Sequence, residues 1–189
     1  MSTTPPPRSM RADARRNYER LLAEAKIVFV EQGVDAALEE IARRAGVGIG
    51  TLYRHFPTRL ALQEAVYHDQ VMEMAQEAFD LAERLPPAEA IRTWMRSVAG
   101  YSRTKRGLMD ALKSTLESDS ELFAACHAKM REAAGVLLSR AQDAGDVRRE
   151  LNGLELLRIS HAISVAAERS PETGELMLTI VMDGLRPQP

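Results

Sequence analysis

Apolar residues recur at intervals of three and four along almost the whole chain, and we find no stretch with the alternation typical of a strand. Such spacing places the apolar side chains on one face of a helix. Glycines and prolines divide the pattern into segments, because a glycine commonly ends a helix and a proline cannot continue one. The sequence therefore predicts an all-α fold of about nine to ten helices.

Three helices are predicted near the N-terminus. The first spans residues 13–32, and Gly33 ends it. Two short helices follow, separated by Gly46, and their inward residues are expected to be Leu38, Ile41, Ala42 and Ala45 in one, and Ile49, Leu52, Tyr53 and Phe56 in the other. Residues 1–12 are rich in proline and serine, so we expect a flexible arm ahead of a small head formed by residues 13–58.

The remaining residues, 59–189, are predicted to form a helical body. Thr58 suits the N-cap of a long helix that Pro86 and Pro87 end. Further helices are expected over 88–100, 107–116, 121–144, 154–168 and 174–185. The last two helices are apolar on more than one side. Burial of the apolar surface that one subunit cannot cover favours a dimer. We expect helices 121–144 and 174–185 to form the dimer interface.

Charge is unevenly distributed along the chain. Residues 1–59 contain 10 Lys and Arg against 7 Asp and Glu, a net charge of +3, whereas the remainder has 15 against 20, a net charge of −5. The basic end is the candidate for binding a polyanion. The chain has no apolar run long enough to cross a bilayer, and its start lacks the apolar core of a secretory signal. We therefore expect a cytoplasmic protein with no membrane contact.

Cys126 and His127, together with His161, are the residues that would suggest a metal site or a thiol sensor. Cys126 lies on the apolar stripe of its helix, where a cysteine acts as a small hydrophobic residue, and one cysteine supplies only one of the ligands that a zinc site needs. The sequence shows no paired carboxylates, no nucleophile with a base and no phosphate-binding glycine loop. We expect no metal, no cofactor and no enzyme; a small helical enzyme or carrier is the rival interpretation.

Residues 38–56, LEEIARRAGVGIGTLYRHF, match a helix-turn-helix, in which two short helices are joined by a turn that contains glycine. Small residues at the start of the second helix, namely Gly48, Gly50 and Thr51, let the backbone approach base edges in DNA. Polar donors surround this helix, and we expect DNA contacts from Arg43, Arg44, Tyr53, Arg54, His55 and Arg59. Tyr53 can pack the second short helix against the first helix of the head and still reach a phosphate with its hydroxyl, whereas Arg43 and Arg44 equally suit the end of a helix dipole.

The segment EIARRAGVGIGTLYRHFPTR resembles the signature of the tetracycline-repressor (TetR/AcrR) family of regulators, and the resemblance extends over residues 18–67. It implies that Gly50 and Thr51 face the major groove and that Tyr53, His55 and Arg59 hold phosphates. The chain departs from the family pattern at Ala37, Gly48 and Arg59. Ala37 cannot cap the second helix through a side chain, so Asp35 becomes the candidate for that role, whereas Gly48 can still cap.

The resemblance implies a homodimeric repressor that dimerises through C-terminal helices, binds a pseudo-palindromic operator in double-stranded DNA and is released by a small molecule. We expect an apolar or amphipathic effector. Soft and aromatic side chains form adaptable pocket walls, and the candidates are Trp94, Met95, Tyr101, Met109 and Phe123. The same residues equally suit a core. A DNA-binding regulator without an effector, or an activator, is the alternative.

Overall fold

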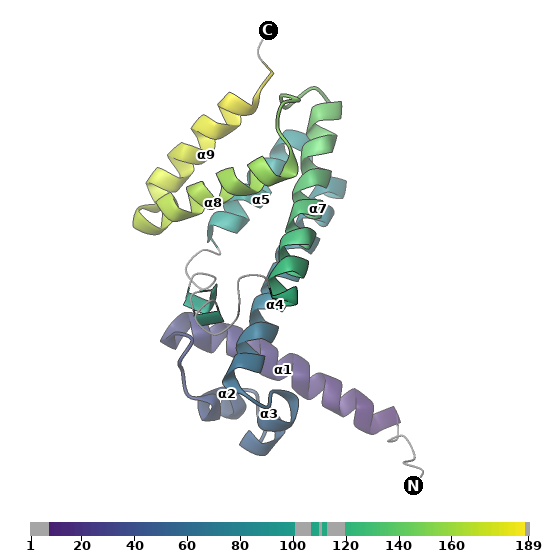
Figure 1. The fold of residues 1–189 in the computed structure, drawn as a ribbon, viewed down its shortest axis with the longest axis vertical. Coiled ribbons are helices and arrows are strands. Elements are labelled where there is room, and N and C mark those ends of the chain that lie inside the picture. Colours follow the sequence, from purple (N-terminus) through teal and green to yellow (C-terminus); the bar gives the residue numbers. More distant parts are fainter. Residues whose placement is uncertain (1–7, 101–106, 110, 113–119, 188–189) are drawn as a thin grey trace. The chain divides into compact units, whose positions relative to one another are not determined.

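The structure is a computed structural model that describes residues 8–100, 107–109, 111–112 and 120–187. All regular secondary structure in these residues is helical (Figure 1), which confirms the predicted all-α fold. The helices form two compact units. The first unit contains the residues up to Tyr67 together with those described between 107 and 112, and the second unit contains the rest.

The first unit comprises α1 (Arg8–Gln32), α2 (Leu38–Arg44), α3 (Ile49–His55) and the start of α4 (Arg59–Arg84). α1 ends where predicted, because Gly33 adopts a φ of 87°, which favours glycine. Its start lies at Arg8, inside the segment that we expected to be a flexible arm. The expectation depended on apolar periodicity, whereas residues 8–16 are helical through the intrinsic preference of alanine, methionine and arginine.

The core of the first unit is formed by the apolar faces of these helices. The buried side chains include Leu21, Ala25 and Val28 of α1, Leu38 and Ile41 of α2, Leu52 of α3 and the adjacent Phe56. Two residues that we expected to face inward are instead 36% exposed, for Ile49, and 46% exposed, for Tyr53. Fewer residues of α3 therefore face the core than its apolar spacing predicts, because a seven-residue helix packs only one of its sides against its neighbours.

The turn between α2 and α3 depends on Gly46. Its φ of 65° lies in the left-handed region, and a Cβ built there would lie 2.7 Å from a guanidinium nitrogen of Arg20. Arg20 donates a hydrogen bond to the carbonyl oxygen of Ala45 in the same turn. A glycine at this position thus satisfies both the backbone conformation and the space left by the arginine.

The second unit comprises the rest of α4, α5 (Pro87–Gly100), α7 (Glu121–Asp143), α8 (Gly153–Arg169) and α9 (Pro171–Leu185). Local signals explain where the last three helices begin. The Ser120 side chain caps α7, Asn152 and Glu155 form a capping box on α8, and Ser170 caps α9. α9 starts before the expected Gly174 because Pro171 is suited to the first turn of a helix.

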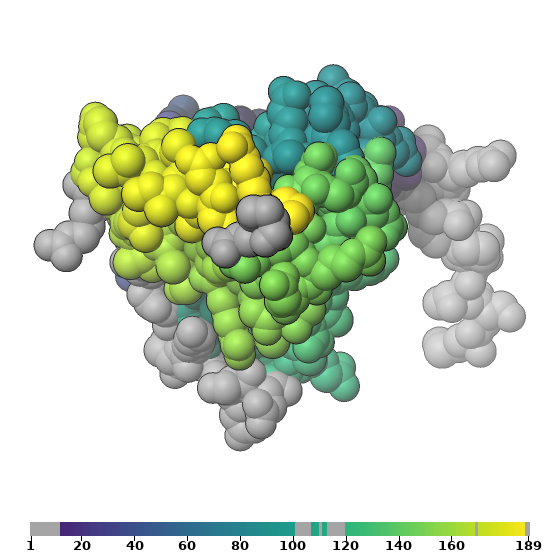
Figure 2. Space-filling model, turned by 90° about the horizontal axis from the view of Figure 1, so that it is seen from above, coloured from purple at the N-terminus to yellow at the C-terminus, as the bar shows by residue number. Residues whose placement is uncertain are grey.

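The predicted apolar stripe of α7 lies in the core of the second unit. All of its members are buried, namely Phe123, Cys126, Met130, Ala133, Leu137 and Ala141. α5 contributes Trp94, whose indole Nε1 donates to the Met74 carbonyl oxygen at 2.9 Å. α9 packs on α8 and lies on the surface of this unit (Figure 2). Throughout the part of the chain that the structure describes, every helix is too short or too polar to span a bilayer.

Candidate nucleic-acid interface

The leading edge of α3 is open. Gly48 is its N-cap, with extended backbone angles of φ −72° and ψ 149°, which confirms that a glycine can occupy this position. A Cβ added at Gly48 or at Gly50 would meet no atom within 4 Å. Neither glycine is needed for packing within the described protein, so the start of α3 carries little side-chain bulk.

Polar side chains follow the open edge along α3. Tyr53 and Arg54 are exposed, whereas Thr51 and His55 are half-buried. The His55 ring lies edge-on to Tyr18 of α1, with 6.0 Å between the ring centroids, and Tyr18 also packs on Phe56 at 5.0 Å. These aromatic contacts fix the end of α3 against α1, which leaves the Tyr53 hydroxyl and the Arg54 guanidinium as donors on an anchored helix.

Arg43 and Arg44, which we expected to contact DNA, are both paired with a carboxylate on α2. Arg43 Nε and Nη2 each donate to Glu40 at 2.8 Å, and Arg44 Nε donates to the same carboxylate at 2.8 Å. Arg44 Nη1 also donates to Glu31 of α1 at 2.7 Å. The hydrogen bonds from Arg43 and then Arg44 lower the pKa of Glu40 from 4.5 to about 2.

This pairing changes what the two arginines can offer. A phosphate that approaches either guanidinium must compete with Glu40, which is ionised at neutral pH. The sequence already contains the signal, because Glu40 precedes Arg43 by three residues and Arg44 by four, the spacings at which helical side chains meet. We did not include Glu40 or Glu31 among the candidate residues.

Arg59 also has a partner inside the first unit. Its Nη1 donates to the carbonyl oxygens of Ala36, at 2.6 Å, and Val34, at 3.3 Å. Gln63, one helical turn later, donates to the Val34 carbonyl at 3.1 Å. Arg59 therefore positions the loop between α1 and α2, and its guanidinium is only partly available to a phosphate.

Asp35 lies in the same loop, and the expectation that it caps α2 is wrong. The N-cap of α2 is Ala37, and no side chain accepts a hydrogen bond from its first turn. Asp35 therefore does not take the capping role, because the chain places Ala37 at the cap and leaves no serine, threonine, asparagine or aspartate there. Nothing in the sequence spacing indicated that Arg59 would hold this loop instead.

The residues expected to line an effector pocket are divided among different places. Trp94 and Met95 of α5 and Phe123 of α7 are buried in the second unit, whose α5 and α7 pack together. Met109 is half-buried and belongs to the first unit. Tyr101 lies outside the described residues. The grouping of these five residues around one effector remains a prediction.

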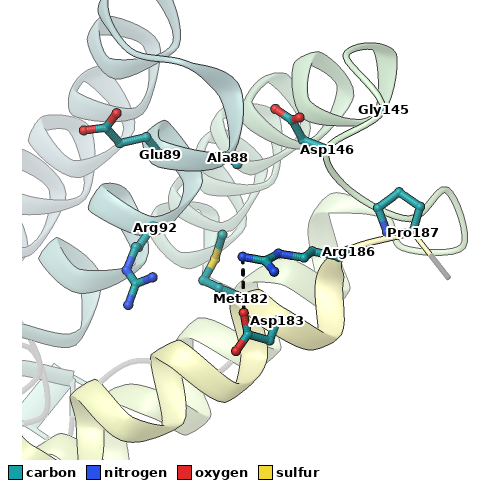
Figure 3. A pocket seen from close by; sticks show the side chains of 9 residues that line it. All are labelled: Ala88, Glu89, Arg92, Gly145, Asp146, Met182, Asp183, Arg186 and Pro187. Carbon is teal, nitrogen blue, oxygen red and sulfur yellow. Dashed lines mark ion pairs between the residues drawn. The ribbon is translucent and has the colours of Figure 1, made fainter.

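Two surface grooves stand out on the second unit, and neither is lined by a predicted residue. The larger has a volume of about 650 Å³ and lies between the start of α5, the turn after α7 and the end of α9 (Figure 3). Its lining carries both signs of charge, including Arg92, Asp183 and Arg186, and the last two are paired at 3.4 Å. The smaller groove, of about 220 Å³, lies among α5, α8 and α9. In the part of the chain described, no cluster of three or more potential metal ligands occurs.

Two family models match the chain. Residues 21–66 match bacterial regulatory proteins of the tetR family, and residues 86–187 match the C-terminal domain of SbtR-like transcriptional regulators. The first match contains α2 and α3 completely, and the second contains α5, α7, α8 and α9. The first match thus lies over the N-terminal helices and the second over the C-terminal helices.

Solved structures and a curated relative agree with these models. The TetR transcriptional regulator SCO0520 from Streptomyces coelicolor is 38% identical, with a TM-score of 0.79 over 91% of this chain and 99% of that chain. A TetR regulatory protein from Mycobacterium vanbaalenii is 35% identical, with a TM-score of 0.76 over 94% and 99% of the two chains. The HTH-type regulator TtgW of Pseudomonas putida is 45% identical over 60 residues, which cover 31% of this chain and 45% of TtgW.

These similarities extend through both units. At the N-terminal end the matched residues include α3, whose start has open space at its glycines. The protein belongs to the TetR family of bacterial transcriptional regulators and is a DNA-binding regulator.

Proposed function

We propose that the protein is a homodimeric repressor that binds a pseudo-palindromic operator through α3 and is released by a small apolar or amphipathic effector. The observation that carries the DNA-binding step is the open edge at Gly48 and Gly50, followed by the exposed Tyr53 and Arg54. In this proposal residues 13–58 bind DNA, residues 59–189 dimerise and receive the effector, and the protein acts in the cytoplasm without catalysing a reaction.

Exposed apolar side chains on α8 and α9 support dimerisation. Leu176 and Ile180, one turn apart on α9, are 60% and 61% exposed, and Leu154 and Val165 of α8 are each more than a third exposed. Exposed apolar side chains on two packed helices are typical of a helical dimer interface. α7 is a weaker candidate than we expected, because its apolar stripe is buried within its own unit.

Two-fold symmetry would supply most of the operator specificity. In the proposed dimer two copies of α3 enter successive major grooves, about 34 to 36 Å apart along one face of DNA. Gly48, Gly50 and Thr51 offer few groups for hydrogen bonding to bases, so each protomer discriminates modestly and the pair discriminates more. An effector would favour a body conformation in which the two heads no longer match this spacing.

A regulator without an effector is the second candidate. Trp94, Met95 and Phe123 are each no more than 2% exposed, and the Trp94 indole nitrogen already has a backbone partner. A core that is filled in this way favours constitutive binding. The two candidates differ in whether any small molecule both binds the protein and weakens its hold on the operator.

The DNA-binding proposal is tested with duplex DNA from upstream of the protein's own gene and a scrambled duplex of equal length, each at several salt concentrations. We expect dimer-stoichiometric binding that persists at physiological salt and is at least about tenfold weaker on the scrambled duplex. Equal and steeply salt-dependent binding to both duplexes would leave only a basic surface and would contradict an operator in that region.

The effector proposal is tested with a panel of apolar and amphipathic small molecules. Compounds that raise the thermal unfolding midpoint are selected and then added at saturation to the protein bound to its operator duplex. We expect at least one of them to weaken operator binding. If every stabilising compound leaves the operator affinity unchanged, the coupling is absent and the regulator without an effector is favoured.

A further inference from the structure

Two sides of α9 hold it in the second unit, and they differ in chemistry. The side that packs on α8 includes the buried Gly174 and Leu178. Gly174 approaches α8 so closely that an added Cβ would lie 2.5 Å from the Cβ of Ala167. Apolar contacts of this kind hold two helices together. Because the hydrophobic effect is non-directional, they fix the rotation of α9 about its axis less firmly than hydrogen bonds do.

The side of α9 that faces α5 is bonded by two arginines. Arg96 donates from Nε and Nη2 to the two carboxylate oxygens of Glu175, at 2.6 and 2.8 Å. Arg92 donates from Nη2 to the Thr179 hydroxyl at 2.8 Å, and Figure 3 shows its side chain pointing from α5 toward α9. The two arginines are four residues apart on α5, and their partners are four residues apart on α9. The two bridges therefore occupy successive turns of both helices.

Apolar packing does not close the space between these helices. The groove of about 220 Å³ lies among α5, α8 and α9, and its lining includes Arg96 and Glu175. The hydrogen bonds from Arg96 hold the pKa of the Glu175 carboxyl below its ordinary value of 4.5, so this group is ionised at neutral pH. A bidentate pair of arginine and carboxylate has a defined geometry. The bridges thus fix α9 against α5 at a place where apolar side chains leave open space.

The rotation of α9 decides which of its side chains face outward. Leu176 follows Glu175 by one residue, and Ile180 follows Thr179 by one residue, so the apolar pair is turned from the bridged pair by about 100° around the helix axis. Leu176 and Ile180 are 60% and 61% exposed. A change in the rotation of α9 would therefore move both apolar side chains relative to the rest of the surface.

We propose that Arg92 and Arg96 are positioning residues for the dimer interface, because they fix the rotation at which Leu176 and Ile180 face the partner protomer. The inference rests on the proposed dimer through α9. The arginines act through their bridges and not by contact with the partner. The members of the Arg96 ion pair are about half exposed, and such a pair contributes little to folding. The effect should therefore be larger on dimerisation than on secondary structure.

The test measures the dissociation constant of the dimer by sedimentation over a range of protein concentrations. The variant R92Q/R96Q removes both bridges. R84Q/R149Q is the charge-matched control, since it removes two exposed arginines of the same unit that lie outside α5, α8 and α9. We expect the first variant to raise the dissociation constant by about threefold to tenfold, and the control to leave it unchanged.

A charge swap separates positioning from a general loss of stability. R96E and E175R each place like charges opposite one another, so each should weaken the dimer. The double variant R96E/E175R restores an ion pair of reversed polarity between α5 and α9. It should recover most of the affinity that the single variants lose. Destabilisation of the fold alone would add up in the double variant and would not be reversed.

Far-ultraviolet circular dichroism should be unchanged in R92Q/R96Q. An unchanged dissociation constant in this variant, or an equal rise in R84Q/R149Q, would overturn the inference and leave the proposed dimer in place. A charge swap that recovers no affinity would overturn it as well. If R92Q/R96Q does not fold, the comparison of R96E with R96E/E175R decides alone. If the unmodified protein is a monomer at every concentration, the proposed homodimer itself fails.

Discussion

At the scale of single residues, Glu40 links the fold of the head to its charge. It holds Arg43 and Arg44 through side-chain hydrogen bonds, and this lowers its pKa from 4.5 to about 2. The two arginines are therefore partners of a carboxylate, and a phosphate would have to compete with it. A substitution that keeps the shape of the Glu40 side chain but removes its charge tests this competition.

Glu40→Gln should make duplex binding more dependent on salt. The substitution removes the negative charge and frees Arg43, while Arg44 keeps Glu31 as a partner. One additional phosphate contact would steepen the slope of log affinity against log salt by about 0.9. Glu39→Gln is the matched control, because Glu39 is the exposed neighbour on the same turn and has no described bond to either arginine. If both variants steepen the slope equally, removal of any negative charge is the cause.

The same variant should alter the pH dependence of stability. The lowered pKa means that folding favours the ionised form of Glu40. The contribution of Glu40 to the free energy of unfolding is therefore complete above pH 4.5 and disappears as pH falls toward about 2. The difference in unfolding free energy between the unmodified protein and E40Q should therefore shrink over this range. Denaturant titrations at a series of pH values measure it, and a difference independent of pH would contradict the pairing.

Arg59→Ala should lower stability as well as DNA affinity. Its guanidinium bonds to the Ala36 and Val34 carbonyls, and loss of hydrogen bonds from a charged donor costs about 1.5 to 3 kcal/mol. Arg59→Lys keeps the charge but has a single donor group, so it should recover part of the stability. Denaturant unfolding separates the two roles. An Arg59→Ala variant with unchanged stability and weakened DNA binding would make Arg59 a phosphate ligand only.

At the scale of elements, the glycines around the helix-turn-helix have different purposes. Gly46 has a positive φ and faces Arg20, whereas Gly50 lies inside α3 with open space where a Cβ would be. The turn therefore requires Gly46, whereas no packing within the described protein requires Gly50. Replacement of Gly46 should lower stability, and replacement of Gly50 should lower DNA affinity.

Gly46→Ala should destabilise the protein by about 1 to 2 kcal/mol, the cost of a left-handed conformation for a residue with a side chain. Gly50→Ala should leave stability equal or slightly higher, because alanine favours helix, and should weaken duplex binding by blocking close approach. Thermal unfolding and duplex titration of both variants provide the measurement. Destabilisation by Gly50→Ala would show that the open edge of α3 has a packing role.

The dimer interface can be located with charged substitutions on single helices. Leu176→Glu combined with Ile180→Glu should convert the protein to a monomer if α9 contributes to the interface, because dimerisation would then bury two carboxylates per protomer without a partner of opposite charge. Val136→Glu is the control on α7, where this side chain is 37% exposed. Sedimentation velocity reports the mass. A monomer from Val136→Glu and a dimer from the α9 variant would support the α7 interface that the sequence pattern favoured.

Elements were easier to predict from sequence than their ends and contacts. The helix-turn-helix, the stops at Gly33 and Gly46 and the buried stripe of α7 follow from periodicity and local conformation, which are properties of neighbouring residues. The start of α1 at Arg8 was not predicted, because helix preference without apolar spacing leaves no pattern. The bonds from Arg59 to Val34 and Ala36 join residues more than twenty positions apart, and only the folded chain brings them together.

At the scale of the whole molecule, we propose that α3 contacts DNA and that the body sets the spacing of the two α3 helices in a dimer. In this proposal α3 reads base sequence, with Thr51 at the groove and Tyr53 at the DNA backbone. These roles separate cleanly, because a base contact changes preference between sequences whereas a phosphate contact weakens binding to all of them. Substitution of each residue should therefore leave a different signature.

The most direct measurement is the ratio of dissociation constants for the upstream duplex and the scrambled duplex, in the unmodified protein, Thr51→Ala and Tyr53→Phe. We expect Thr51→Ala to reduce this ratio by about fivefold or more, since a base contact contributes about 1 kcal/mol or more of discrimination. Tyr53→Phe should weaken binding to both duplexes and leave the ratio unchanged. A ratio that is unchanged in Thr51→Ala but falls in Tyr53→Phe would contradict the proposal that α3 reads bases through the residues at its N-terminal end.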